Sequence, residues 1–182
     1  THFPNKRVLG VLIPTVEESV GKTKNRRIGV IATEGTVASD AFTKELKKLN
    51  SDIKVFEKAC PLLVPVVEAG EHNSEATEIV LKQYINPVLK KNIDTLILGC
   101  TNYGILEPRI KKIIGDSVKI IHSAGVVPKK LKTYLKNHPD IKQKLGTKKR
   151  TIFYSTDLSP RFKILGSRFF GRNIKVQKIS LL

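Results

Sequence analysis

Hydrophobic and polar residues follow two different periods along the chain. Continuous aliphatic runs predict strands, because strands covered on both faces of a parallel sheet carry few polar positions. Seven segments are predicted to be strands, several of them such continuous runs: 8–14, 27–33, 52–56, 93–100, 118–123, 151–156 and 174–181. Between several of them, apolar residues recur at helical spacing. This alternation with short links predicts an α/β fold in which helices flank a parallel sheet.

Residues typical of helix boundaries mark several helical segments. One helix is expected over 38–49, with Thr36 available as its cap. Two others begin with proline in the first turn and end at glycine, over 107–115 and 160–171. Between these two helices lies the polar, turn-rich segment 137–150, where a domain boundary or a crossover is expected.

A further helix is predicted to begin at Ser74, which precedes acidic residues of the first turn. Its periodicity is expected to direct Ile79, Val80 and Tyr84 toward the core. Pro87 is expected to kink or end this helix, because proline lacks the backbone N–H that the helical hydrogen bond needs.

Charge is spread unevenly over the 182 residues, which carry a net charge of +17 and are 40% hydrophobic. Residues 128–182 hold 15 basic and two acidic side chains, a net of +13, whereas residues 1–127 have a net of +4. Such asymmetry occurs in nucleic-acid and membrane surfaces. Because no aromatic-basic recognition motif accompanies the basic residues, a solvated basic face is the favoured interpretation and nucleic acid is not expected as a partner.

Several classes of protein are not indicated by the sequence. No apolar run approaches the roughly 20 residues of a membrane span, and the first residues lack a signal-peptide pattern. Two cysteines forty residues apart favour a reducing cytoplasm over a disulfide framework. The four histidines lack metal-ligand spacing, so no metal site is predicted.

Two predicted strands end in polar side chains that could bind a ligand. In "GVIATEGT", Thr33 and Thr36 follow a buried strand, and in "LILGCTNYG", Cys100, Thr101 and Asn102 do so. Ligands of open α/β sheets bind beyond the carboxyl ends of the strands. A thiol beside a helix amino-terminus has a lowered pKa and can act as a nucleophile or as an acid/base. The pattern alone leaves Cys100 either such a thiol or a buried core cysteine.

Three segments occur together in an order that resembles a known family. The segments are "GVIATEGTVASDAF", "ACPLLVPVVEAGE" and "LILGCTNYGILEPRI", and the carboxyl-terminal "TIFYSTDLSPRFKILGSRFFG" extends the likeness over nearly the whole chain. Together they resemble the glutamate racemases of the cofactor-independent aspartate/glutamate racemase superfamily. The resemblance implies two α/β lobes with glutamate between them, each lobe supplying one cysteine. One thiolate removes the α-proton and the opposite thiol returns a proton to the other face, without a cofactor.

The resemblance also implies roles for individual residues. Cys100 matches the proton-transfer cysteine of the second lobe, and Thr101 and Asn102 match the substrate-contacting pair that follows it. Cys60 matches a position that is not catalytic and is interpreted as a core residue.

Three further positions match the surroundings of the family's pocket. Glu68 matches an acid near the cysteine, although the sequence alone favours a surface carboxylate. Thr33 and Thr36 match hydroxyl positions close to the substrate, and turn formation or helix capping is the alternative for both.

Two departures from the family pattern affect these expectations. The family pattern at this cysteine is Gly-Cys-Thr-His-Tyr-Pro, whereas this chain has Asn102 in place of the histidine and Gly104 in place of the proline. The Asn102 amide cannot carry a proton at neutral pH, as a histidine can. The first lobe's Asp-Ser-Gly, Tyr-Gly and Cys-Asn-Thr motifs are not found in these 182 residues. We therefore expect one complete lobe over 8–125 and a segment over 126–182 that returns to the other lobe, whose amino-terminal part is missing here.

The resulting functional hypothesis is a cytoplasmic glutamate racemase, an isomerase that supplies D-glutamate for peptidoglycan and could form a homodimer. Two alternatives stay open. Asn102 and the missing lobe motifs favour a non-catalytic relative that binds an anionic ligand or a partner. The basic carboxyl-terminal residues favour a polyanion-binding module.

Overall fold

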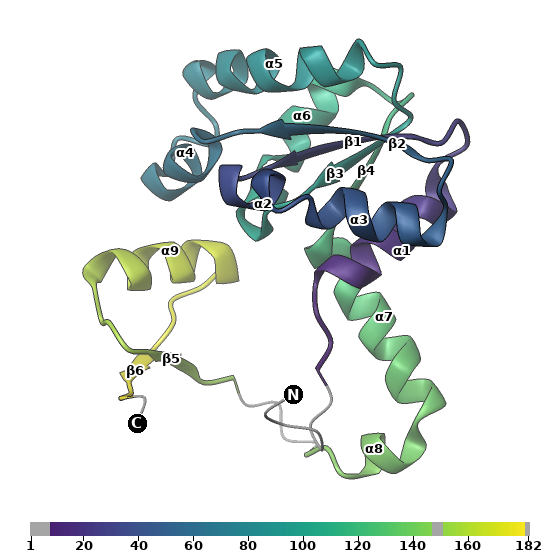
Figure 1. Ribbon diagram of the computed structural model, residues 1–182. Helices are drawn as coiled ribbons and strands as arrows, with labels where there is room; N and C mark the ends of the chain where they lie inside the picture. The colour runs from purple at the N-terminus through teal and green to yellow at the C-terminus, as the bar shows by residue number, and fades with distance from the viewer. Residues whose placement is uncertain (1–7, 147–150, 181–182) are drawn as a thin grey trace. The chain divides into compact units, whose positions relative to one another are not determined.

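The computed structural model describes residues 8–146 and 151–180 (Figure 1). The chain divides into two compact units, Thr1–His138 and Pro139–Leu182. This division falls within the predicted boundary segment 137–150, whose residues 147–150 lie outside the described part. The predicted limit at residue 126 falls inside the helix Ser123–Asn137 and does not coincide with this division. The assignment of 8–125 and 126–182 to two lobes stays a prediction.

A four-stranded parallel sheet forms the centre of the first unit, in the order β2-β1-β3-β4. Its strands are β1 (Arg27–Ala32), β2 (Lys54–Ala59), β3 (Thr95–Leu98) and β4 (Lys119–His122). All three pairings are parallel. The predicted α/β fold with a helix-flanked parallel sheet is confirmed, and the carboxyl ends of all four strands consequently lie at one edge.

Helices cover both faces of this sheet (Figure 1). On one face, Ile31, Leu96 and Leu98 form a buried cluster with residues of α4 (Leu63–Ala69), α5 (Glu75–Leu89), the 3₁₀ helix η1 (Thr101–Leu106) and α6 (Glu107–Ile114). On the other face, Ile28, Val30 and Ile97 pack with α1 (Leu12–Lys22) and α3 (Ala41–Leu49). Helix α7 (Ser123–Asn137) contacts α1. The alternation of Ile28, Val30 and Ile31 between the clusters reflects the two-residue period of a strand.

The predicted strand over 8–14 is wrong, because Leu12 is the first residue of helix α1. Val8 and Ile13 of this stretch are exposed, whereas Val16, one turn further along the helix, is buried. Helical spacing therefore describes the burial here better than a continuous run does. Pro14 fits within the first turn, where a backbone N–H has no helical acceptor.

The helix predicted over 38–49 is divided into α2 (Glu34–Ala38) and α3. Asp40 adopts a left-handed conformation with φ 54°, which interrupts the helix between the two parts. Thr36 lies inside α2 and caps neither part, so that prediction is wrong. The α2 cap position is occupied by Thr33.

Helix α5 begins after Ser74, whose side chain accepts a hydrogen bond from the Thr77 N–H, as predicted. Its buried face is formed by Thr77, Leu81, Ile85 and Val88, whereas Ile79 is 68% exposed. The expectation that Ile79 points inward is therefore wrong, while Val80 and Tyr84 pack at the edge of the core. Pro87 does not end the helix, which continues for two more residues.

The second unit contains α8 (Pro139–Gln143), β5 (Phe153–Ser155), α9 (Pro160–Phe170) and β6 (Val176–Lys178). Strands β5 and β6 form a separate two-stranded parallel sheet. Residue 181 of the predicted strand 174–181 lies outside the described residues. Helix α9 has the predicted bounds, with the Ser159 side chain accepting from the Phe162 N–H and Gly171 at φ 76° closing it. Ile174 is buried, whereas several large apolar side chains of this unit, among them Phe162 and Ile164, are exposed.

Candidate active site at the carboxyl ends of the strands

Cys100 lies two residues beyond β3, at the start of η1. Its side chain is half-buried and packs against the core cluster beneath α4 and α5. The Tyr103 N–H donates to the Cys100 carbonyl over 3.1 Å, which closes a tight turn directly after the strand. The structure thus has Cys100 where the apolar run predicted it, at the carboxyl edge of the sheet.

Gly99 allows β1 and β3 to approach each other closely at this edge. Its N–H donates to the Ile31 carbonyl over 2.8 Å. A Cβ at residue 99 would lie 2.9 Å from both the Ala32 Cβ and the Phe42 ring. Only glycine therefore fits here without movement of the core, and this fit keeps the Cys100 turn next to the end of β1.

Cys60 has surroundings very different from those of Cys100. It is fully buried, its Sγ lies 3.4 Å from the Lys58 carbonyl, and its own carbonyl accepts from the Tyr103 hydroxyl over 3.0 Å. Burial raises the pKa of the Cys60 thiol to about 12, against a smaller lowering by Lys58. The same burial raises the pKa of Tyr103. Cys60 is therefore a neutral core thiol near pH 7, consistent with the structural interpretation.

Thr101 and Asn102 are the first two residues of η1 and directly follow Cys100. Thr101 is exposed and Asn102 is half-buried. Glu68 belongs to α4, a helix that contacts η1. It is half-buried rather than fully exposed, which brings a carboxyl group onto an element beside the Cys100 turn.

Thr33 directly follows β1, whose carboxyl end is paired with that of β3 through Ile31 and Leu98. Its Oγ1 lies 2.9 Å from the Thr36 Oγ1, so the two hydroxyls share a hydrogen bond. Neither side chain caps a backbone N–H of α2. The two predicted hydroxyl groups are thus adjacent to each other and at the same sheet edge as Cys100.

A histidine–carboxylate pair that no sequence motif had indicated also lies at this edge. His122 is the last residue of β4, and its Nε2 lies 3.1 Å from the Glu107 Oε2 of α6. The His122 Nδ1 is buried and has no hydrogen-bond partner among the described residues. One feature of the sequence could have indicated His122 as a site residue, namely its position at the end of the predicted strand 118–123. The same criterion identified Cys100.

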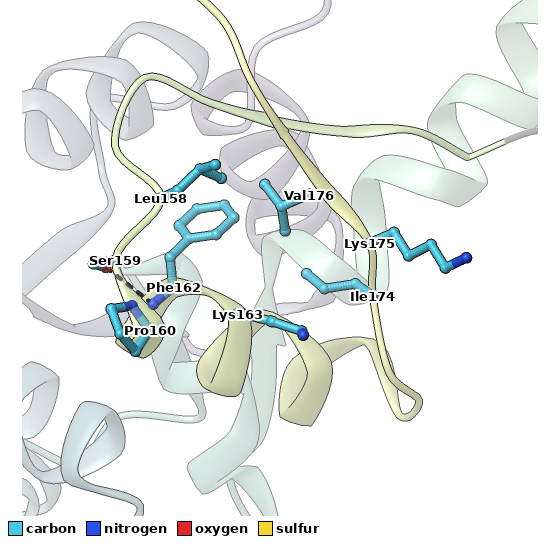
Figure 2. Close-up of a pocket in the computed structure, with 8 residues that line it drawn as sticks. All are labelled: Leu158, Ser159, Pro160, Phe162, Lys163, Ile174, Lys175 and Val176. Carbon is cyan, nitrogen blue, oxygen red and sulfur yellow. Dashed lines mark hydrogen bonds between the residues drawn. The ribbon is translucent and has the colours of Figure 1, made fainter.

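The described residues also form a hollow in the second unit, beside α9 and β6 (Figure 2). Leu158, Phe162 and Ile174 contribute apolar side chains to it and Lys163 contributes an ammonium group. None of the predicted site residues lies in this unit. The predicted site instead gathers at the sheet edge of the first unit.

Within residues 8–146 and 151–180, no helix combines the length and the apolar character that a membrane-spanning helix requires.

The sequence is similar to those of glutamate racemases from several organisms. A glutamate racemase of Persephonella marina is 42% identical over 96% of this chain, and the match covers 64% of that protein. One from Aquifex pyrophilus is 39% identical over 95% of this chain and 63% of its own length. The chain therefore spans somewhat less than two thirds of these relatives.

Solved structures of glutamate racemases have the same fold. An isoform from Bacillus anthracis superimposes with a TM-score of 0.86 at 36% identity, covering 97% of this chain and 66% of its own. The Francisella tularensis enzyme, solved in complex with D-glutamate, gives a TM-score of 0.81 at 31% identity over 93% and 62% of the two chains. The family model for Asp/Glu/hydantoin racemases matches residues 4–128, which include the whole sheet and the Cys100 turn. The chain accordingly belongs to the Asp/Glu/hydantoin racemase family.

Proposed function

We propose that this chain is the greater part of a glutamate racemase, which interconverts L- and D-glutamate. The observation that carries the proposal is the half-buried Cys100 at the carboxyl end of β3, in a family whose reaction moves a proton at an α-carbon. Relatives named glutamate racemase support glutamate as the substrate. A solved relative in complex with D-glutamate supports it further.

In this proposal Cys100 transfers a proton at one face of the glutamate α-carbon. Its thiolate takes the α-proton of one enantiomer, and a second thiol gives a proton to the opposite face. In the reverse direction the two groups exchange roles. The proton lost from carbon is replaced by one from sulfur, so the reaction needs no redox cofactor or pyridoxal group.

Cys60 does not fit the role of the second thiol. It is fully buried in the same unit as Cys100, and its pKa is raised to about 12 by burial. These 182 residues contain no further cysteine. We propose that the opposite thiol belongs to the part of the protein that the longer relatives have in addition.

The polar groups around Cys100 are proposed to hold the substrate. The amide of Asn102 and the hydroxyls of Thr101, Thr33 and Thr36 can bind the α-carboxylate and the amino group. Such donors stabilise the negative charge that develops when the α-proton leaves. Glu68 on α4 is proposed as an acid that assists proton exchange with the cysteine.

The whole protein is proposed to act in the cytoplasm, to supply D-glutamate for peptidoglycan and to form a homodimer. Residues 8–125 would form one lobe, and 126–182 would contribute to the other. Light scattering after size-exclusion chromatography tests the homodimer. A monomer with full activity would refute that part of the proposal.

The test is conversion of each glutamate enantiomer by the protein expressed from its full reading frame, measured by chiral chromatography. We expect conversion in both directions and a loss of about 10²–10⁴-fold in Cys100→Ser, as for removal of an acid/base group. The matched control, Cys60→Ala, removes the other thiol and should stay active. A folded protein that binds glutamate without converting it would instead favour the non-catalytic alternative.

A further inference from the structure

His122 lies beside the strand that leads to Cys100. In the pairing of β3 with β4, His122 is the partner of Leu98, two residues before Cys100. Helix α7, which begins directly after His122, contacts η1. The imidazole is therefore at the same edge of the sheet as the proposed proton-transfer thiol.

Two glycines and one carboxylate surround the imidazole ring. A Cβ at Gly104 would lie 3.3 Å from the His122 Nδ1, and one at Gly125 would lie 3.2 Å from its Nε2. Gly104 is in η1, in the turn that begins at Cys100. The ring thus contacts the backbone of the Cys100 turn, and the absence of a side chain at residue 104 makes the room for it.

Glu107 determines which ring nitrogen is basic. A carboxylate only accepts hydrogen bonds, so the Nε2 that lies 3.1 Å from Glu107 Oε2 carries the hydrogen. In the neutral ring this leaves a lone pair on Nδ1, the atom that is buried and has no partner among the described residues. Buried polar atoms are nearly always hydrogen-bonded, so a lone pair without a partner on this ring needs an explanation.

We propose that His122 supplies the Cys100 turn with the imidazole base that Asn102 cannot provide. No hydrogen bond joins Nδ1 to the Cys100 thiol in the described structure, and catalytic hydrogen bonds often form only as the reaction proceeds. The thiol then turns toward the ring and gives its proton to Nδ1, so sulfur becomes the thiolate and the ring becomes imidazolium. Glu107 stabilises that cation through Nε2, as an orienting carboxylate does. The inference rests on the proposed function only in taking Cys100 as the proton-transfer thiol. It explains Asn102 and Gly104 together, since the glycine makes room for an imidazole that reaches the turn from β4.

The experiment measures the rate of Cys100 alkylation by iodoacetamide near neutral pH, followed by mass spectrometry of the cysteine peptides. Because the thiolate is the reacting form, His122→Asn should slow alkylation about tenfold. Glu107→Gln should slow it less. His138→Asn, at the far end of α7, is the matched control and should react as the native protein does. Free imidazole should restore the rate in His122→Gly, and Asn102→His should restore it in His122→Asn.

Two results would overturn the proposal. One is an unchanged rate of Cys100 alkylation in a His122→Asn variant whose circular dichroism and melting temperature are native. The other comes from ¹⁵N-histidine NMR of the unsubstituted protein, if the neutral His122 ring carried its hydrogen on Nδ1. Neither readout uses glutamate turnover, so a failure here is distinct from a failure to racemise.

Discussion

The two cysteines show how strongly the surroundings of a side chain decide its chemistry. Cys60 is fully buried with a pKa raised to about 12, whereas Cys100 is half-buried at the sheet edge. We expect thiol reagents to label Cys100 well before Cys60 near neutral pH, because only a small fraction of Cys60 is thiolate there. Peptide mass spectrometry after timed labelling measures this order. Earlier labelling of Cys60 in the folded protein would contradict the assignment.

At the residue scale, the sequence predicted positions better than partners. An apolar run that stops before Cys100 was enough to predict its location at a strand end. The pair of His122 with Glu107 was not predictable, because the two residues belong to different elements and meet only when β4 and α6 have folded. The Thr36 cap failed because Asp40 turns the chain at a point where the periodicity continues.

At the element scale, the close pairing of β1 with β3 depends on Gly99. We expect Gly99→Ala to lower the free energy of unfolding by about 1–3 kcal/mol, because the added Cβ overpacks against Ala32 and Phe42. Gly35→Ala in α2 is the matched control, since a Cβ there meets nothing within 4 Å, and should leave the free energy of unfolding unchanged or raise it by up to about 1 kcal/mol. Urea denaturation measures both. Equal effects of the two substitutions would contradict the packing argument.

Asp94 joins the loop before β1 to the start of β3, at the opposite edge of the sheet. Its carboxylate accepts from the Thr23 hydroxyl and from the Lys24 and Asn25 N–H groups over 2.6–2.7 Å. Burial alone would raise its pKa, but these hydrogen bonds hold it below its usual value. Asp94→Asn should destabilise the fold by about 1–3 kcal/mol near neutral pH. The amide NH₂ group of asparagine is itself a donor and cannot accept the hydrogen bonds that the carboxylate oxygen accepted.

The acid dependence of this effect follows from the sign of the shift. A carboxyl group with a lowered folded-state pKa stabilises the fold above its unfolded-state pKa, and this contribution is lost as the pH falls through the folded value. The difference between native protein and Asp94→Asn should therefore shrink in acid. The control is Asp116→Asn, because Asp116 is fully exposed and should matter little. A difference that grew toward low pH would contradict this role.

The sequence predicted the sheet well, and its errors share a physical cause. The two central strands of the first unit, β1 and β3, are short, largely aliphatic runs that are buried on both faces, which gives them a pattern that few other elements have. Residues 8–14 are also aliphatic, but they form the start of a helix with Ile13 exposed. A short apolar run does not by itself distinguish a strand from a helix, because burial in the fold decides between them.

At the scale of the whole molecule, the chain spans 64% of the Persephonella marina relative. Inversion needs an acid and a base on opposite faces of the α-carbon, and in the proposed mechanism Cys100 supplies one of them. We therefore expect the 182 residues alone not to racemise glutamate, whereas the full reading frame should do so. Chiral chromatography of both proteins makes the comparison. Full inversion by the 182-residue chain would refute the argument for two lobes.

The most direct test of the account is deuterium incorporation at the glutamate α-carbon in heavy water, followed by NMR with the full-length protein. If Cys100 transfers the α-proton, each inverted glutamate acquires solvent deuterium, and Cys100→Ser lowers the rate about 10²–10⁴-fold. Cys60→Ala should retain incorporation, because that thiol is buried away from the reaction. Incorporation at the native rate by a folded Cys100→Ser variant would contradict the central claim that this thiol moves the proton.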